Sequence, residues 1–299
     1  MAEMAVRAFH RNSDTILAGL ALGAIPIGFS TMISKPFRIR SRLVMNGVRR
    51  LKQNLRQLME QFLPGGNEPG GDAWRLSLRI RIVHAQSRHF LLESDEWDAA
   101  VYGTPLSASH MNLGAAGFSG GLMLYVMMLG GDFTDEERDA YAHVWRYTGV
   151  TMGIPETIMF TDQESALEVS RIGAECEPPP DEDSIIMANS IVNSVPLVLG
   201  VKDPKIRQAK AQYFYKISRE LMGDEMADRL RFPPKHRIKV VPIAHVRTKL
   251  KQRLGRLPVL SRMLRRERFG QMLYVTDLGN LDHSYNLPTA LLDDESRDW

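Results

Sequence analysis

A single cysteine, Cys176, occurs among the 299 residues, so the chain can form no disulfide within itself. Nothing in the composition requires an oxidising compartment, and we expect a cytoplasmic protein. The sequence also lacks the C-x-x-C, H-E-x-x-H and E-x-x-H spacings of structural zinc, zincin and di-iron carboxylate sites. Phosphate loops of the G-x-G-x-x-G and G-x-x-x-x-G-K-S/T kinds are absent too. Disulfide scaffolds, those metal centres and the common nucleotide-binding folds are therefore excluded.

What is present is the composition of a folded globular chain. Hydrophobic residues make up 44% and charged residues 24%, which is enough for one large core or two smaller ones and excludes disorder and collagen-like repeats. Strong breakers are few: a glycine- and proline-rich loop at 63–71 and an acidic, proline-rich connection at 175–183. No hairpin dipeptide separates two alternating runs, so we predict an all-α fold in a single globular helical domain.

Three helices have clear start signals. A threonine followed three residues later by glutamate forms a capping box, an aspartate or serine can cap a helix alone, and Asp-Pro is a common helix start. These signals predict helices from Thr134 to about Tyr147, from Asp183 or Ser184 to Leu199, and from Asp203 to Met222.

The segment 79–89 places a histidine between two arginines, with Arg81 three residues before His84 and Arg88 four residues after it. If the segment is helical, all three side chains lie on one face. A period-two alternation over 75–82 fits a strand equally well, and a strand would turn Arg81 and His84 to opposite sides. On a helix, one imidazole flanked by two guanidinium groups suits a metal that carries its own anionic groups, such as haem with its propionates.

Several motifs in the region 49–167 resemble the haem-dependent oxygenases of the latex clearing protein and MpaB type. That family carries R-x-x-H-A-x-x-R on a core helix, and its histidine is the proximal haem ligand. The matching residues here are Arg81, His84 and Arg88, followed by Trp97, a Gly-Thr-Pro turn at 103–105, a helix start at 129–137 and an H-x-W-R-x-x-G-x-x-x-G-I run at 143–154. The resemblance implies that His84 binds haem b and that Arg81 and Arg88 hold its propionates.

On the distal side of the haem, latex clearing proteins have R-x-x-K-T on the preceding helix. The same frame here reads Arg50-Leu-Lys-Gln-Asn54, so Gln53 replaces the lysine and Asn54 replaces the threonine. Lys52 is one position out of phase, about 100° around a helix. The resemblance implies that dioxygen reacts on the face formed by Arg50, Gln53 and Asn54, without a cationic sixth ligand. No acid lies within 32–40 to act as the family's proposed base.

The resemblance implies that the domain encloses a haem between its core helices. It also implies that the protein is a haem b-dependent oxygenase, which uses O2 to cleave a C=C bond of a small hydrophobic, isoprenoid-like substrate. An alternative stays open: a haem-binding or haem-free membrane-surface protein that keeps the scaffold without oxygenase activity. We expect three parts, an apolar N-terminal helix region at 1–35, the oxygenase-like helical domain at 36–232, and a basic helical extension and tail at 233–299.

Both ends leave a choice about membranes. Thr15–Ser34 is a run of twenty uncharged residues, for which we favour a buried or docked helix over a membrane anchor. Lys235–Arg268 contains twelve Lys or Arg and one acid, Glu267, with apolar residues at helical spacing on both sides of Pro258. Such a face is either a solvated helix packed on the domain or a peripheral contact with anionic lipid. No nucleic acid partner is expected, because the net charge is only +3 and no reading motif accompanies the patch.

Other conspicuous residues have plain structural interpretations. Packing on an amphipathic helix is as good an account of His143 and Trp145 as a place in the haem pocket. The methionine-rich stretch 123–128 is expected to be deformable core. His89 is expected to point away from the iron.

Overall fold

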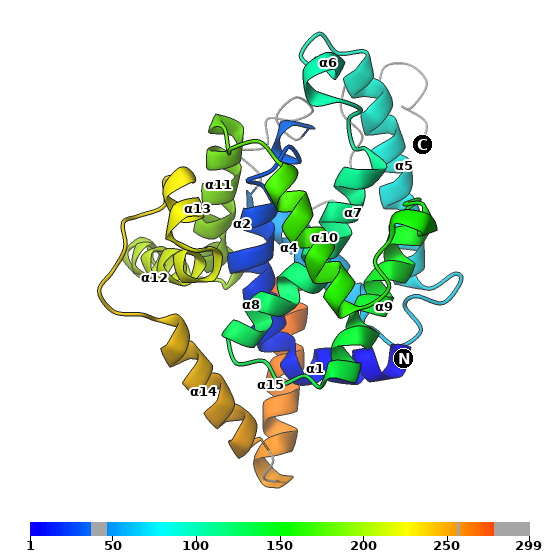
Figure 1. The fold of residues 1–299 in the computed structure, drawn as a ribbon. Coiled ribbons are helices and arrows are strands. Elements are labelled where there is room, and N and C mark those ends of the chain that lie inside the picture. Colours follow the sequence, from blue (N-terminus) through cyan, green and yellow to red (C-terminus); the bar gives the residue numbers. More distant parts are fainter. Residues whose placement is uncertain (37–46, 256–257, 278–299) are drawn as a thin grey trace.

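The computed structural model describes residues 1–36, 47–255 and 258–277. Within these ranges the chain consists of helices and turns without a strand, so the predicted all-α fold is confirmed (Figure 1). The elements in chain order are α1 (Ala2–Gly19), η1 (Leu20–Ala24), α2 (Ile25–Gly28), α4 (Gly47–Gln61), α5 (Asp72–Leu92), α6 (Ala99–Tyr102), α7 (Ala108–Ala116), η3 (Gly117–Gly121), α8 (Leu122–Met128), α9 (Asp135–Thr151), η4 (Glu156–Ile158), α10 (Gln163–Cys176), α11 (Glu182–Val198), α12 (Pro204–Met222), α13 (Asp224–Arg229), α14 (Val241–Leu254) and α15 (Pro258–Thr276).

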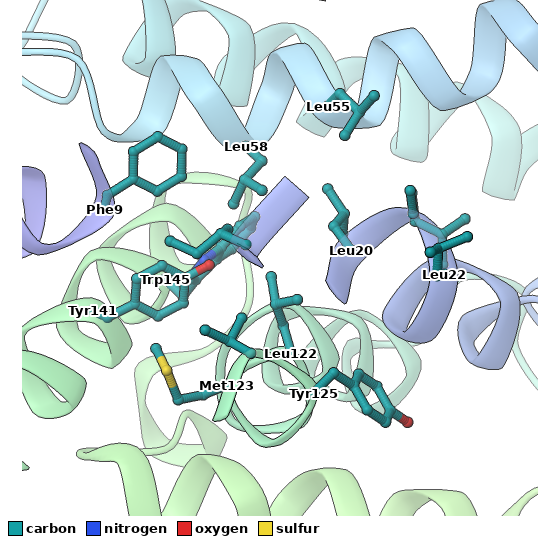
Figure 2. Close-up of a cluster of buried hydrophobic side chains, with 14 of the residues drawn as sticks. Phe9, Leu20, Leu22, Leu55, Leu58, Leu122, Met123, Tyr125, Tyr141 and Trp145 are labelled. Atoms are coloured by element: carbon teal, nitrogen blue, oxygen red, sulfur yellow. The ribbon is translucent and has the colours of Figure 1, made fainter. Parts of the chain in front are cut away.

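Two long apolar segments contact one another in the core. One runs through α1, η1 and α2, the other through α7, η3 and α8, and each contains a π-helical turn. Gly23 allows their close approach, because a Cβ at this position would lie 2.5 Å from the ring of Tyr125. Leu55 and Leu58 of α4 point toward Leu20 of the first segment (Figure 2). The core is therefore built around these two segments with α4 packed across them.

The uncharged run at 15–34 lies in this core. Ile16 and Leu20 are fully buried, and Phe29 is 4% exposed, which fits the buried-helix interpretation of the run. Among the described residues, Ala108–Met128 is the one helix long and apolar enough to cross a membrane, and half of the apolar window is buried inside the protein.

Aromatic rings tie α1, α4 and α9 together. Phe62, directly after α4, stacks on Phe9 of α1 with ring centroids 4.6 Å apart and on Tyr141 of α9 at 4.7 Å. Trp145, one turn further along α9, stacks on Phe118 at 5.1 Å. Offset or stacked aromatic pairs each contribute about 0.5–1.5 kcal/mol beyond the area they bury.

A buried polar junction fixes α5 against α4 and α9. The Gln61 amide at the end of α4 donates to Ser77 Oγ of α5 at 3.3 Å and accepts from Thr148 Oγ1 of α9 at 2.7 Å. All three residues are about 1% exposed. Burying an amide costs free energy unless both its NH2 group and its carbonyl oxygen form hydrogen bonds. The junction therefore sets where α5 lies.

The predicted helix starts at Thr134 and Asp203 are confirmed. Thr134 and Glu137 form a full capping box, and Asp203 accepts from the N–H groups of Lys205 and Ile206. The predicted cap at Asp183 or Ser184 is wrong by two or three residues, because Asp181 accepts the Ser184 N–H and α11 begins directly after it.

Two of these helices end away from their expected last residues. Helix α9 continues to Thr151, four residues beyond the expected end, through Gly149. Helix α11 ends at Val198, with Leu199 as its C-cap.

The basic C-terminal region forms two helices separated before Pro258, as expected. Helix α14 runs along the edge of the molecule and contacts α8 and α12, while α15 runs back to contact α1 and α4 (Figure 1). Ala244, His245, Thr248 and Gln252 of α14 are partly buried, and His245 Nδ1 lies 3.1 Å from the Met128 carbonyl oxygen. The opposite side of α14 faces away from the domain.

Candidate functional site

The segment 79–89 is part of the 21-residue helix α5, so the strand alternative is excluded. Its buried residues, Ala73, Ser77, Ile80, Ser87 and Leu91, recur every three, four or seven positions and form one inward-facing row. The period-two pattern misleads because arginines at 75, 79 and 81 alternate with apolar residues that a helix distributes around its circumference.

His84 belongs to the inward row of α5. It follows Ile80 by four residues and precedes Ser87 by three, and its side chain is partly buried. The structure thereby places Arg81, His84 and Arg88 on one side of one helix. The two arginines differ in their surroundings.

Arg81 is exposed and lies over the turn after α9. A Cβ at Gly153 would come within 3.0 Å of Arg81 Nε and 3.2 Å of its Cζ. Gly153 also has a φ of +95°, a conformation that favours glycine. The backbone conformation therefore favours glycine at this position, and the side chain of Arg81 packs closely over it.

Arg88 binds the turn that joins α6 to α7. Its Nε donates to the Pro105 carbonyl at 3.2 Å and its Nη2 donates to the Leu106 carbonyl at 2.6 Å. Trp97 Nε1 holds the start of the same turn by donating to the Gly103 carbonyl at 2.9 Å. Two separate motifs of the sequence therefore meet here, and part of the donor capacity of Arg88 is used by the protein itself.

Arg50, Gln53 and Asn54 lie together on α4 and are all partly buried. Asn54 Nδ2 donates to the Arg50 carbonyl at 2.9 Å. Lys52 is turned away from this face and donates to the Asp277 carbonyl at 2.7 Å. The out-of-phase lysine is therefore engaged at the end of α15.

The run at 143–154 positions the turn beside Arg81. Arg146 donates to the Phe160 carbonyl at 3.0 Å and pairs with Glu156 at 2.7 Å. Gly149 lies against Met159, whose Cε would be 2.7 Å from an added Cβ. Trp145 is buried in the aromatic core, whereas His143 is exposed. This run thus serves packing and positioning.

The remaining conspicuous side chains have structural surroundings. His89 is exposed and lies 3.5 Å from Glu93. Met123 and Val126 are within the hydrophobic core, as expected, whereas the prediction is wrong for Leu124 of the same stretch, which is 49% exposed.

One polar cluster beside this region could not be found in the sequence. His110 of α7 lies 2.9 Å from Ser107 Oγ through Nδ1 and 3.1 Å from the Glu177 carboxylate through Nε2. Glu177 also accepts the N–H of Met32 at 2.7 Å. A carboxylate, 8% exposed, thus reaches the segment in which the sequence has no acid. Glu177 and Met32 are separated by 145 positions in the sequence, and no local pattern signals this contact.

The donor set fits a haem better than a metal held by protein alone. No three His, Cys, Asp or Glu side chains gather into a metal site within the described parts of the chain. A haem iron takes four nitrogens from its macrocycle and needs only one axial histidine, and arginines can pair with the propionates. His84 with Arg81 and Arg88 supplies that combination of groups.

The fold and these residues define an all-α protein with a histidine flanked by arginines on a core helix. The chain belongs to the family described as "ER-bound oxygenase mpaB/B'/Rubber oxygenase, catalytic domain", whose model matches residues 8–248. A solved structure of latex clearing protein in the closed state has the same fold, with a TM-score of 0.72 and 15% identity. The match covers 95% of this chain and 76% of that one. No curated protein matches this sequence.

The His110–Glu177 pair makes stability depend on pH. The hydrogen bond to Glu177 raises the pKa of His110 above 6.5, against the opposing effect of burial. A pKa raised in the folded state stabilises the protein below about 6.5, and this contribution is lost as pH rises through the folded-state pKa. We expect His110→Gln to lower the free energy of unfolding more at pH 6 than at pH 8.5, as measured by urea denaturation. Equal losses at both pH values would contradict the assignment.

Proposed function

We propose that the protein is a haem b-dependent oxygenase that uses O2 to cleave a C=C bond in a small hydrophobic, isoprenoid-like substrate. The observation that carries this proposal is the position of His84 between Arg81 and Arg88 on the inward side of α5. Membership of the MpaB and rubber oxygenase family supports an oxygenase. When bound, haem b would supply the iron at which dioxygen is activated.

The residues of α5 would bind and orient the cofactor. His84 would hold the haem iron through its imidazole, and the exposed guanidinium of Arg81 would pair with a propionate. Arg88 donates hydrogen bonds through Nε and Nη2 to the carbonyl oxygens of residues 105 and 106. Its Nη1 N–H groups would therefore be the ones that donate to the second propionate. Arg88 would then couple the cofactor to the turn before α7.

The polar face of α4 would stabilise negative charge that develops on oxygen. Helices α4 and α5 meet where Gln61 contacts Ser77. Gln53 precedes Gln61 by eight residues on α4, about 12 Å of helical rise, and His84 follows Ser77 by seven residues on α5, about 10.5 Å. Gln53 and His84 therefore lie at similar distances along their helices from this contact. Arg50, Gln53 and Asn54 supply N–H donors there, which is the requirement for such stabilisation.

The overall reaction needs no external reductant. One C=C bond and the O–O bond break, and each alkene carbon gains one oxygen atom to give two carbonyl fragments. Both atoms of O2 are consumed in the products. Oxygen uptake in the presence of a solubilised isoprenoid alkene such as squalene, with analysis of carbonyl products, tests this activity.

The first prediction concerns the axial ligand. We expect His84→Ala to lose the Soret absorption of the purified protein while far-UV circular dichroism stays nearly unchanged, because alanine favours the helix. His89→Ala is the matched control, since His89 lies five residues further on the same helix and is exposed beside Glu93. Full haem content in the His84 variant would rule out the ligand assignment.

A second prediction follows from the replacement of the family lysine by Gln53. Without an amine on this face, the resting ferric haem is expected to be high-spin and to take added imidazole or cyanide readily. Gln53→Lys should shift the spectrum toward six-coordinate low-spin. Native Lys52 does not supply an amine to this face, because it is bound to the Asp277 carbonyl. A wild-type protein that is already low-spin and resists both ligands would contradict this reading of α4.

The alternative, a membrane-surface protein without oxygenase activity, makes a different prediction for the same samples. It gives either no Soret band or a haem spectrum without alkene-dependent oxygen uptake. Both the oxygenase and the membrane-surface protein would have a surface that suits contact with a membrane.

We infer that α14 makes the peripheral membrane contact. Its outward side carries a row of exposed apolar residues at helical spacing. The row is formed by Ile243, Val246, Leu250 and Leu254, which are 45–67% exposed. The sequence pattern also included apolar side chains at 257, 260 and 264, which lie outside the described residues. Exposed Arg247 and Arg253 stand beside it. An apolar row flanked by cations suits the headgroup region of an anionic bilayer.

This contact predicts salt-sensitive binding to anionic vesicles. Each basic residue near the surface contributes on the order of 1 kcal/mol before screening, and the attraction falls off over about 8 Å at physiological ionic strength. Val246→Ser with Leu250→Ser should reduce co-sedimentation with anionic liposomes. Ile172→Ser, which changes an equally apolar but isolated exposed residue on α10, should not. Equal binding to neutral and anionic lipid, or no binding, would identify α14 as a solvated helix.

A further inference from the structure

A second candidate binding site lies on the other side of α4. A cavity of about 470 Å³, partly open to solvent, is lined by α1 and η1, α4, the end of α11, Phe214 of α12, and the last part of α15. Helix α15 contacts both α1 and α4, so it forms the outer wall (Figure 1). Small-molecule sites in proteins have volumes of roughly 300–1,000 Å³, so this one suits a slender ligand.

The walls of the cavity are apolar along its length. The lining includes Leu17 and Leu22 from the first helical segment, Leu51 and Leu55 from α4, and Met272 and Val275 from α15. The cavity is separate from the proposed oxygen-binding face, because at 100° per residue Leu51 and Leu55 point about 160–200° away from Gln53. Nothing in the proposed oxygenase reaction requires this cavity.

Charged side chains gather at one end. Asp14 of α1 and Arg268 of α15 both line the cavity, with Asp14 Oδ2 3.6 Å from Arg268 Nε. Lys251 of α14 binds the same oxygen at 2.6 Å. Arg268 Nη1 also donates to the Arg11 carbonyl at 2.8 Å. Two cations thus share one carboxylate, which leaves a local excess of one positive charge.

Among the described residues, Asp14 is the one acid that lines the cavity. Gln271 lines the cavity and donates to Glu267, but Glu267 is exposed and outside the lining. Asp14 and Lys251 side chains are each 35% exposed, whereas that of Arg268 is only 13% exposed. The charged end is therefore open enough to exchange a partner with solvent, and its guanidinium is mostly shielded from water.

On both the first helical segment and α15, a charged residue of the cavity lining comes first in the sequence and the apolar lining residues follow it. On the first segment Asp14 precedes Leu22 by eight residues, and on α15 Arg268 precedes Val275 by seven. These separations correspond to about 12 and 10.5 Å of helical rise. The cavity therefore has a cationic end followed by an apolar part of this length, and a longer chain would lie bent within its volume of about 470 Å³.

We propose that this cavity binds a long-chain fatty acid, with its carboxylate at Arg268 and Lys251 and its acyl chain along α1, α4 and α15. The two cations match one carboxylate, to which arginine can donate two parallel hydrogen bonds. The apolar walls match one chain, whose burial drives binding. The ligand carboxylate replaces that of Asp14 as the partner of Arg268.

The competition with Asp14 gives substitutions of opposite sign. Arg268→Gln should weaken binding of radiolabelled palmitate about tenfold, the equivalent of one charge-assisted hydrogen bond. Asp14→Asn should strengthen it, because the competing carboxylate is removed. Arg229→Gln is the matched control, since this arginine pairs with Glu225 on α13, outside the cavity lining. Damage to the fold would weaken binding in both cavity variants, so the opposite signs identify the site.

Competition and a filling variant test the two ends separately. Hexadecan-1-ol should displace palmitate less well than unlabelled palmitate does, and acetate should not displace it. Ala18→Phe should abolish binding of both long-chain compounds, with circular dichroism to show that the fold persists. The proposal is overturned if palmitate does not bind, if hexadecanol competes as well as palmitate, or if the two charge variants shift affinity in the same direction. Haem absorption measured on the same samples reports separately on the proposed oxygenase site.

Discussion

The position of the candidate site depends on one buried amide, that of Gln61. It joins Ser77 on α5 to Thr148 on α9, and all three side chains are shielded from water. An apolar residue at 61 would leave two hydroxyl groups without this partner, whereas the amide satisfies both with one donor and one acceptor. Hydrophobic packing alone would allow α5 to rotate or slide. The junction fixes its position, and with it the direction in which His84 points.

The motifs around His84 become intelligible once α5 is fixed. Arg81 then packs over Gly153, and Arg88 reaches the carbonyls at 105 and 106. Residues far apart in sequence therefore meet at α5: Arg88 anchors the turn before α7 by hydrogen bonds, and Arg81 covers the turn after α9.

The family frame is kept where it builds the fold and altered where chemistry would occur. Arg81, His84, Arg88 and the glycines of the 143–154 run keep their spacing and have packing partners in the structure. Gln53 and Asn54 differ from the family pattern, and Glu177 brings a carboxylate to the segment at 32. Residues that match the family pattern thus also serve packing, whereas the two that differ lie on the polar face of α4.

The sequence by itself determined the helical class, the capping box at Thr134, the start at Asp203 and the family, because these depend on local spacing that survives in any tertiary context. It did not determine whether 75–82 was helix or strand, because arginines and apolar residues alternate there and only the buried row Ser77–Ile80–Ser87 separates the two periods. The tertiary structure alone decided the Gln61 junction, the His110–Glu177–Met32 cluster and the cavity behind α15. Each of these joins groups that are distant along the chain, and the energy of a buried polar contact or of an apolar wall exists only once folding has brought those groups together.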